Sequence, residues 1–273
     1  MLAPDMAYGM KDNRTPGAMN QDALQRHGAS PWNSASNQYA SGHDFAYHLL
    51  DSLKNEPALF PSYLTELSGN SWEKSSSLLA DFAHLYAISS HGWPALATQV
   101  AANLKDQLES DLSPAQLAQS LFGDSITHAD CIRQLAIAVG PTRLRAGLTT
   151  AEANALAHRR RIEILLESER TGCALGTGVA ITLSWHRLTG QISQMLRAAP
   201  TSGQPAINIP GLDETPGLSN APLSELARNL SVVAQSQAAR RGLLFGVGQA
   251  LALQATFWSM LADRARTLAK QTN

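Results

Sequence analysis

The sequence has few cysteines and few charged residues for its length. Two cysteines, Cys131 and Cys173, occur in 273 residues, and they do not form a CxxC pair. A disulfide framework is therefore excluded, and a reducing compartment is the natural environment. Charged residues make up 16% of the chain, the formal net charge is −1, and no run of like charge is longer than Arg159-Arg160-Arg161. Nucleic acid is consequently not an indicated partner.

The catalytic signatures that spacing alone can reveal are missing as well. The sequence contains no GxSxG, HExxH, GxxxxGK[ST] or DxxxD motif and no ExxH pair. The first ten residues hold no basic segment followed by an apolar run, so we expect no Sec-type signal peptide. These observations predict a cytoplasmic protein and leave open whether it is an enzyme.

Residues 1–41 are rich in Asn, Gln, Ser, Gly and Ala, and Leu2 and Leu24 are their only branched aliphatic residues. Such a composition cannot bury enough apolar surface to fold, so it predicts a disordered polar arm. One interpretation is an ordinary flexible terminus. The other is a docking or export segment, without a cleavage site, that a partner recognises, with Trp32 and Tyr39 as anchors.

The rest of the chain is predicted to be an all-α, multi-helix bundle. Apolar residues recur at helical spacing, and no stretch of four to eight residues alternates with the period of a half-buried strand. Residues 42–140 are expected to form a layer of short helices, and 141–273 two long helices joined by a Pro/Gly-rich linker at 198–222, all in one compact domain. The short helices are expected to begin after Gly42 and to continue with 61–68, 72–91, 95–110, 114–122 and 128–139.

One pattern occurs twice in the second part of the chain. Residues 151–183 align without a gap on residues 221–253, with nine identities, three of which are glycines. Because no proline interrupts 142–199 or 223–273, both copies are predicted to lie in long continuous helices. We interpret the pattern as an internal repeat.

Small residues follow one stripe along each predicted long helix. The first stripe contains Gly172, Gly176 and Ala180, and the second contains Gly242, Gly246 and Ala250. Small residues at every fourth position let two helix backbones approach closely. We therefore predict that the two helices pack against each other along these stripes, in either a parallel or an antiparallel orientation.

Histidines and carboxylates also recur at helical spacing, and they are candidate metal ligands. The candidates are Asp44, His48, Asp81, His84, His91, Glu163 and Glu167. Helical bundles build metal sites from such side chains on several helices, and haem needs one axial histidine beside a groove that glycine leaves open. Ordinary surface pairs at i,i+4 spacing are the alternative interpretation.

Two functional hypotheses follow from the sequence. The first is a non-enzymatic interaction protein with a protein partner, for instance a bacterial secretion-system component or a secreted effector, because of the polar arm and the missing catalytic motifs. The second is a helical-bundle oxygenase-type enzyme that uses iron or haem, because of the candidate ligands and the glycine stripes. The uncharged run 242–262 is long enough to span a bilayer, but its polar residues favour a buried core helix over membrane contact.

Overall fold

The structure is a computed structural model that describes residues 39–59, 63, 72–92, 125–141, 147–198, 209 and 220–271. Within these ranges the chain forms seven α-helices and a short 3-10 helix, with no strand, so the predicted all-α bundle is confirmed. The predicted helices 95–110 and 114–122, most of 61–68 and of the linker 198–222, and the arm up to residue 38 lie outside the described residues.

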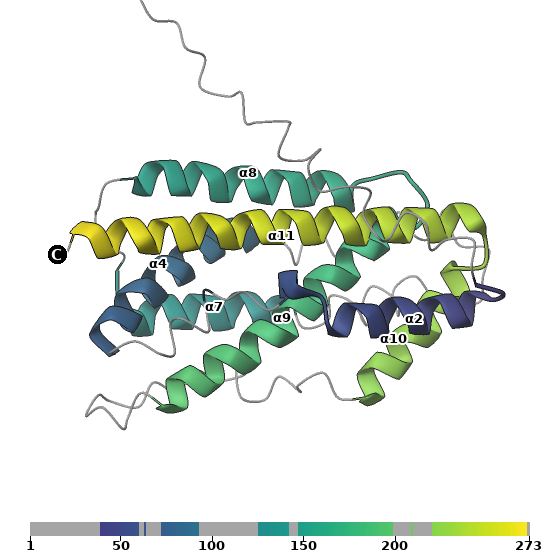
Figure 1. Cartoon of the computed structure of the whole chain (residues 1–273), viewed down its shortest axis with the longest axis horizontal. Helices are drawn as coiled ribbons and strands as arrows, with labels where there is room; N and C mark the ends of the chain where they lie inside the picture. Colours follow the sequence, from purple (N-terminus) through teal and green to yellow (C-terminus); the bar gives the residue numbers. More distant parts are fainter. Residues whose placement is uncertain are drawn as a thin grey trace, which may run out of the picture.

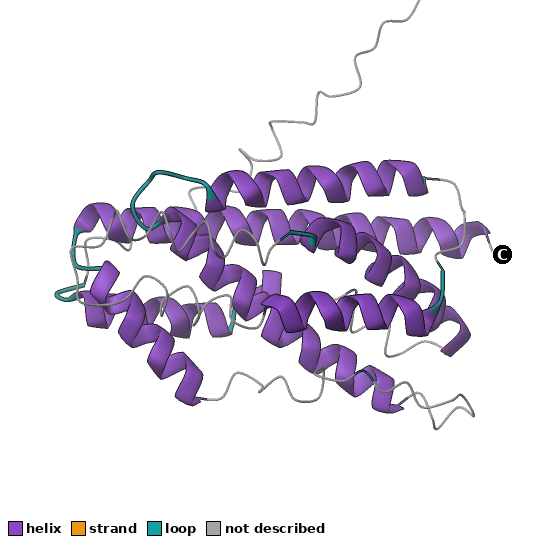
Figure 2. Cartoon of the chain, turned by 180° about the vertical axis from the view of Figure 1, so that it is seen from behind, coloured by secondary structure: helices purple, strands orange, loops and turns teal. Residues whose placement is uncertain are grey.

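The longest described helix, α11, runs along the whole bundle and organises the others around it. The elements are α2 (Gly42–Lys54), η3 (Pro57–Leu59), α4 (Trp72–Ser90), α7 (Ser125–Val139), α8 (Leu148–Leu166), α9 (Cys173–Ala198), α10 (Asn220–Val233) and α11 (Gln237–Gln271). Helix α11 packs on α9, α8 and η3, while α4 packs on both α7 and α8, and α2 packs on α10 (Figure 1). Seen from behind, α8 again lies at the edge of the bundle beside α11 (Figure 2).

Helix α2 begins where the sequence predicts a start. Ser41 is the N-cap, and its hydroxyl accepts a hydrogen bond from the backbone N–H of Asp44 at 3.1 Å. Such a cap satisfies one of the N–H groups that have no partner within the helix. Phe45, Leu49 and Leu53, one helical turn apart, are buried with at most 2% exposure, so this helix places one apolar face on the core.

The prediction of one continuous helix over 142–199 is wrong, because the chain leaves the helical conformation between the end of α8 and the start of α9. Gly172, in the turn before α9, has a φ of 83°, a conformation that favours glycine. The backbone N–H of Arg170 donates to Ser168 Oγ at 3.3 Å, and that of Cys173 donates to the Arg170 carbonyl at 2.9 Å. A Cβ at Gly172 would also lie 2.6 Å from the carbonyl oxygen of Ala239, so this turn requires glycine for both its conformation and its space.

The helix predicted over 223–273 is broken as well, at residues 234–236. Ser236 caps α11 by accepting the backbone N–H of Ala239 at 3.1 Å, and Arg240 Nε donates to the Ala234 carbonyl at the end of α10 at 2.8 Å. The two breaks are not equivalent: Gly242 lies inside α11, whereas Gly172, with which it aligns, lies in a turn. The secondary structure therefore does not reproduce the sequence repeat in register.

Helices α9 and α11 meet backbone to backbone at three glycines. A Cβ at Gly176 would clash with the Leu243 carbonyl of α11, and one at Gly246 would clash with the Cys173 carbonyl of α9. A Cβ at Gly242 would clash with the carbonyl of Thr171, just before α9. No side chain fits between backbones that lie this close together, so glycine at these three positions is what allows α9 and α11 to cross. Further along the same two helices, Ala180 and Ala250 are fully buried.

The segment from Gln237 to Thr267 of α11 is long and apolar enough to cross a membrane, by length and composition alone. It contains the uncharged run 242–262, which is long enough to span a bilayer. Half of its most apolar window is buried inside the bundle. A core helix of a folded domain passes the same test, so membrane contact stays a prediction that only a lipid-binding experiment can check.

Candidate functional site

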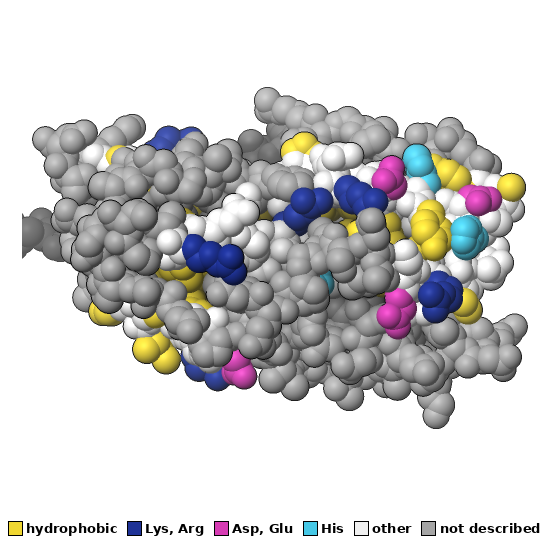
Figure 3. All heavy atoms as spheres, turned by 90° about the horizontal axis from the view of Figure 1, so that it is seen from below, with side chains coloured by type: hydrophobic (Ala, Val, Ile, Leu, Met, Phe, Trp, Pro, Cys, Tyr) yellow, Lys and Arg dark blue, Asp and Glu magenta, His cyan; other side chains and the backbone are white. Residues whose placement is uncertain are grey.

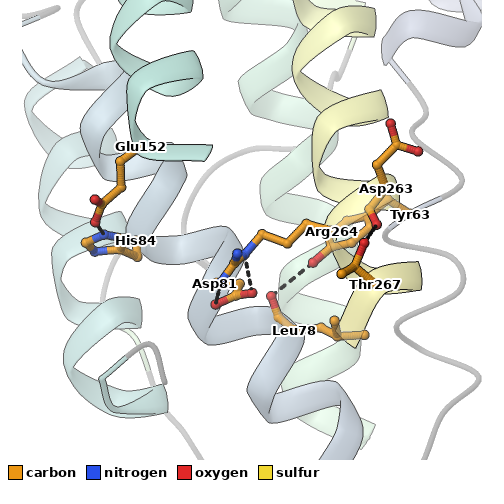
Figure 4. A network of polar contacts seen from close by, with 8 residues as sticks. All are labelled: Tyr63, Leu78, Asp81, His84, Glu152, Asp263, Arg264 and Thr267. Carbon is orange, nitrogen blue, oxygen red and sulfur yellow. Dashed lines mark hydrogen bonds and ion pairs between the residues drawn. The ribbon is translucent and has the colours of Figure 1, made fainter. Parts of the chain in front are cut away.

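The candidate metal ligands lie on different faces and at different ends of their helices. Asp81 and His84 leave α4 in different directions, Asp81 toward α11 and His84 toward α8 (Figure 4). Asp44 and His48 are on α2, Glu163 is on α8, and His91 and Glu167 are exposed residues just beyond the ends of α4 and α8. Within the part of the chain that the structure describes, no group of three or more His, Cys, Asp or Glu side chains is arranged to hold a metal ion.

Asp81 forms a buried ion pair with Arg264, which joins α4 to α11. Arg264 Nε donates to Asp81 Oδ2 at 2.7 Å, and its Nη2 donates to Oδ1 at 3.3 Å (Figure 4). The two side chains are only 5% and 6% exposed. Two parallel hydrogen bonds of this kind fix the orientation of both groups and satisfy charges that would otherwise be costly inside the protein. Asp81 is thus a partner of arginine in this fold.

His84 and Glu163 take part in more exposed ion pairs. His84 Nε2 lies 2.7 Å from Glu152 Oε1 of α8, and the two side chains are 39% and 35% exposed. Glu163 accepts hydrogen bonds from Arg159 at 2.7 Å and Arg160 at 3.3 Å. Burial raises the pKa of Glu163, but these hydrogen bonds and the two positive charges outweigh it, so the pKa lies below its usual value. Both glutamates are on α8, where Glu152 joins this helix to α4 through His84, and Glu163 pairs with arginines of its own helix.

His128, which the sequence did not single out, lies in a stack of rings. Its ring is sandwiched between Trp185 of α9, with centroids 3.4 Å apart, and Tyr86 of α4, with centroids 5.5 Å apart. Burial, and then the nearby His186, lower the pKa of His128 to about 3. Burial also raises the pKa of Tyr86 well above its usual value. Both groups are therefore neutral at physiological pH, and the stack is held by ring packing.

His158 of α8 is a second buried, neutral histidine. It is 7% exposed, and its ring lies 5.1 Å from that of Phe257 on α11. Neither of its ring nitrogens has a hydrogen-bond partner. Burial, and then the positive charge of Arg161, lower the pKa of His158 to about 4. A buried polar group without a partner is uncommon and needs an explanation, such as a bound ligand or water.

The side chain of His158 also lines a cavity of about 50 Å³ between α8 and α11. Its polar lining consists of Asn154, His158, Arg161 and Thr256, and its apolar lining of Ala157, Leu253, Phe257 and Met260. A water molecule needs about 10–15 Å³ by this measure, and a cavity of about 150 Å³ can hold benzene. The cavity therefore has room for a few non-hydrogen atoms, which makes it a candidate binding site.

A match to a known protein family covers most of the chain. Residues 62–269, about three quarters of the chain, match a family of unknown function, DUF6975. The chain belongs to this family. No curated protein and no solved structure matches it. The match to the DUF6975 family includes the ion pair between Asp81 and Arg264 and the cavity beside His158, whereas α2 lies before it.

A second hollow lies between α2, outside the family match, and α10. It has a volume of about 480 Å³ and is lined by Tyr47, His48, Leu50, Asp51, Lys54, Leu223 and Ser224. Figure 3, which views the molecule from the side on which α2 lies, shows histidine, acidic, basic and hydrophobic side chains close together on the described surface. Asp51 and Lys54 pair with each other at 3.3 Å, so this surface has no excess of one charge.

The sequence contained a signal for both buried histidines. His158 follows Ala151 and Ala155 and precedes Ile162 on the inward stripe of α8, at helical spacing, and all of these are buried. His128 likewise precedes Cys131, Ile132 and Leu135 at offsets of three, four and seven residues. A polar residue on an apolar stripe is a better indicator of a buried site than a pair of polar residues at i,i+4, which is typical of a helix surface.

Proposed function

We propose that the protein is a non-enzymatic helical interaction protein whose protein partner binds the outer face of α8. The observation that carries this proposal is that α8 has apolar residues on two opposite faces. Its inner stripe is buried in the bundle. Its outer stripe holds Leu156 and Ile164, which are 54% and 55% exposed, with the exposed Ala153 and Ala157 beside them.

The spacing of the outer stripe is that of a helix-binding surface. Residues 153, 156, 157 and 164 fall within a sector of about 100° on a wheel with 3.6 residues per turn. These residues stand at i, i+3, i+4 and i+11, and Arg160 occupies the i+7 position between them. Amphipathic helices recognise partners through apolar residues one or more helical turns apart on one face. Helix α8 lies at the edge of the bundle in both views, and α11 and α4 pack on its other side (Figures 1 and 2). The stripe is thus open to a partner.

The other large hydrophobic side chains that are exposed among the described residues do not form a stripe like that of α8. Tyr47 packs its ring on that of His43 at 4.5 Å, and Phe245 lies under the guanidinium of Arg170 at 4.5 Å. Ile137, at 74% exposure, stands alone on α7. Single exposed hydrophobic residues are normal in soluble proteins, whereas several along one helix face indicate an interaction site.

Site-specific photo-cross-linking in cells that express the full chain tests the proposal. A benzophenone amino acid replaces Leu156, Ile164 or, as a matched control, Ile137. We expect the first two positions to yield the same cross-linked protein, identified by mass spectrometry, and Ile137 to yield none of it. Identical products from all three positions, or no product from α8, would reject α8 as the binding face.

The second part of the proposal concerns export: a secretion apparatus recognises the polar arm, residues 1–41. A deletion should stop at residue 38, because Ser41 caps α2 and Tyr39 packs on Phe45, with ring centroids 5.8 Å apart. The Tyr39 carbonyl also accepts a hydrogen bond from Arg240 at 2.8 Å. Removal of residues 1–38 should abolish export and leave the fold intact, which circular dichroism would verify. Unchanged export would refute this part.

The competing prediction, an iron or haem enzyme, is separated from the interaction proposal by one measurement. Protein purified from iron-supplemented cells is analysed by metal mass spectrometry and visible absorption. Stoichiometric iron or a Soret band would overturn the non-enzymatic proposal. His48, His84, His91, Glu163 and Glu167 would then be the first residues to substitute.

A further inference from the structure

The hollow between α2 and α10 is formed by two helices that pack on each other. Its volume of about 480 Å³ lies within the range of small-molecule sites. Tyr47, Asp51 and Lys54, at offsets of four and seven residues along one face of α2, line it from one side. Leu223 and Ser224, near the start of α10, line it from the other side. Both walls of the hollow are therefore held by packed helices.

Asp51 and Lys54 neutralise each other in this hollow and still have hydrogen-bonding groups to spare. Lys54 Nζ donates to Asp51 Oδ1 at 3.3 Å, and the side chains of Lys54 and Asp51 are 41% and 73% exposed. An ammonium group has three N–H donors and a carboxylate has two acceptor oxygens, so this bond leaves two donors on Lys54 and leaves Oδ2 on Asp51. A ligand can bond to both groups while the ion pair stays closed. Because the pair has no net charge, it favours a neutral ligand over an ionic one.

Two aromatic side chains of α2 line the same hollow. Tyr47 is 42% exposed, and its ring packs on that of His43, with centroids 4.5 Å apart. The ring of the exposed His48 packs on that of Tyr39, with centroids 5.0 Å apart. These contacts are made by the rings, so the Tyr47 hydroxyl and the His48 nitrogens can donate and accept hydrogen bonds. The buried Leu50 adds apolar lining, so the hollow offers ring and apolar surface beside mixed donors and acceptors.

We propose that this hollow binds a neutral sugar of one or two pyranose units. Each hydroxyl of a sugar both donates and accepts, and the C–H groups of the ring form an apolar face. One hydroxyl donates to Asp51 Oδ2, its neighbour accepts from Lys54 Nζ, and the C–H face packs on the Tyr47 ring. The described lining contains no residue of α8, so this inference goes beyond the proposed function and does not depend on it.

The test is a titration of full-length protein labelled with ¹³C and ¹⁵N at histidine, followed by NMR. Glucose, galactose, mannose and maltose are added separately, with sodium glucuronate and glucosamine as charged analogues of similar shape. The spectrum of His48→Gln assigns the His48 ring resonances. We expect at least one neutral sugar to shift them saturably with a Kd of about 1 mM, and the charged analogues to bind more weakly. The ring resonances of His158, which is buried on α8, should stay unchanged.

A matched pair of variants sharpens the result. Asp51→Ala and Glu225→Ala each remove an exposed carboxylate, but Asp51 lines the hollow, whereas Glu225, next to Ser224 on α10, does not. Asp51→Ala should weaken sugar binding at least tenfold, because it removes a charged acceptor, and Glu225→Ala should leave the Kd unchanged. Both positions are exposed, so both variants should fold, which circular dichroism would verify.

Three results would overturn the proposal. The first is the absence of a saturable shift of the His48 resonances below about 0.1 M sugar. The second is binding of glucuronate or glucosamine that equals or exceeds that of the neutral sugars. The third is an equal Kd for Asp51→Ala and Glu225→Ala, which would place the bound sugar outside this hollow.

Discussion

The two halves of α11 pack by different means. From Gln237 to Ala250 its glycines place it against the backbone of α9, where even a Cβ would clash. From Leu253 to Arg264 it meets α8 and α4 through large and polar side chains, and a cavity of about 50 Å³ lies beside it. Close contact between backbones leaves little that a ligand could use. The second half has the space and the polar groups that a binding site needs.

The difference follows from side-chain size. Beyond Ala250, the buried positions of α11 include large residues such as Phe257 and Trp258, whose side chains fill space between this helix and its neighbours. Rings fill part of the resulting space: Phe82 of α4 stacks on Trp258, with centroids 5.8 Å apart. Such a mixed interface tolerates buried polar groups, provided that each finds a partner.

The largest effect is expected at the buried ion pair of the second half. Asp81→Ala leaves the Arg264 charge buried without a partner, which should cost about 3–5 kcal/mol in the free energy of unfolding, measured by urea denaturation. Asp263→Ala is the matched control, because Asp263 pairs with Arg266 on the surface of the same helix. It should change stability by less than about 0.5 kcal/mol. Equal effects of the two variants would show that the Asp81 pair is not buried in solution.

A pH dependence is the next largest effect. The folded-state pKa values of His128 and His158, about 3 and about 4, lie below the unfolded value of 6.5. Between these values the unfolded chain binds more protons, so stability decreases as the pH falls below 6.5. At about 1.4 kcal/mol per pKa unit, His158 alone should remove about 3 kcal/mol by pH 4. Denaturation curves at several pH values should show a shallower slope for His158→Leu than for the exposed control His91→Ala, and parallel slopes would contradict the burial of His158.

The first half of α11 provides a third test. Gly176→Ala places a Cβ against the Leu243 carbonyl and should destabilise the fold by about 2–3 kcal/mol, the upper part of the range for overpacking. Gly190→Ala on the same helix meets nothing within 4 Å and should be neutral or stabilising by up to about 1 kcal/mol. Chemical denaturation of both variants gives the comparison. Similar values for the two would mean that α9 and α11 are further apart than the structure places them.

Much of the fold is predictable from local patterns, whereas the partners of its polar groups are not. The helical period beyond Gly42 locates α2, and the start of α4 at Trp72 also follows from the sequence. The breaks at 167–172 and 234–236 do not follow from the sequence, because glycine and serine occur both within helices and at their ends, and no proline marks these breaks. The ion pair of Asp81 joins residues 183 positions apart. No local spacing encodes a contact of that kind, so the sequence alone predicts His and Asp on one helix face as metal ligands.

The smallest effect concerns His84, which the sequence groups with Asp81 as a candidate metal ligand, and its partner Glu152. His84 and Glu152 are 39% and 35% exposed, so water screens their interaction. A double-mutant cycle with His84→Ala and Glu152→Ala should give a coupling energy below about 1 kcal/mol, and less at about 1 M salt. The same cycle on Asp81 and Arg264 should give several times that value. Equal coupling energies in the two cycles would mean that burial does not strengthen the Asp81–Arg264 pair relative to the exposed His84–Glu152 pair. Two ion pairs that begin one turn apart on α4 would then contribute alike.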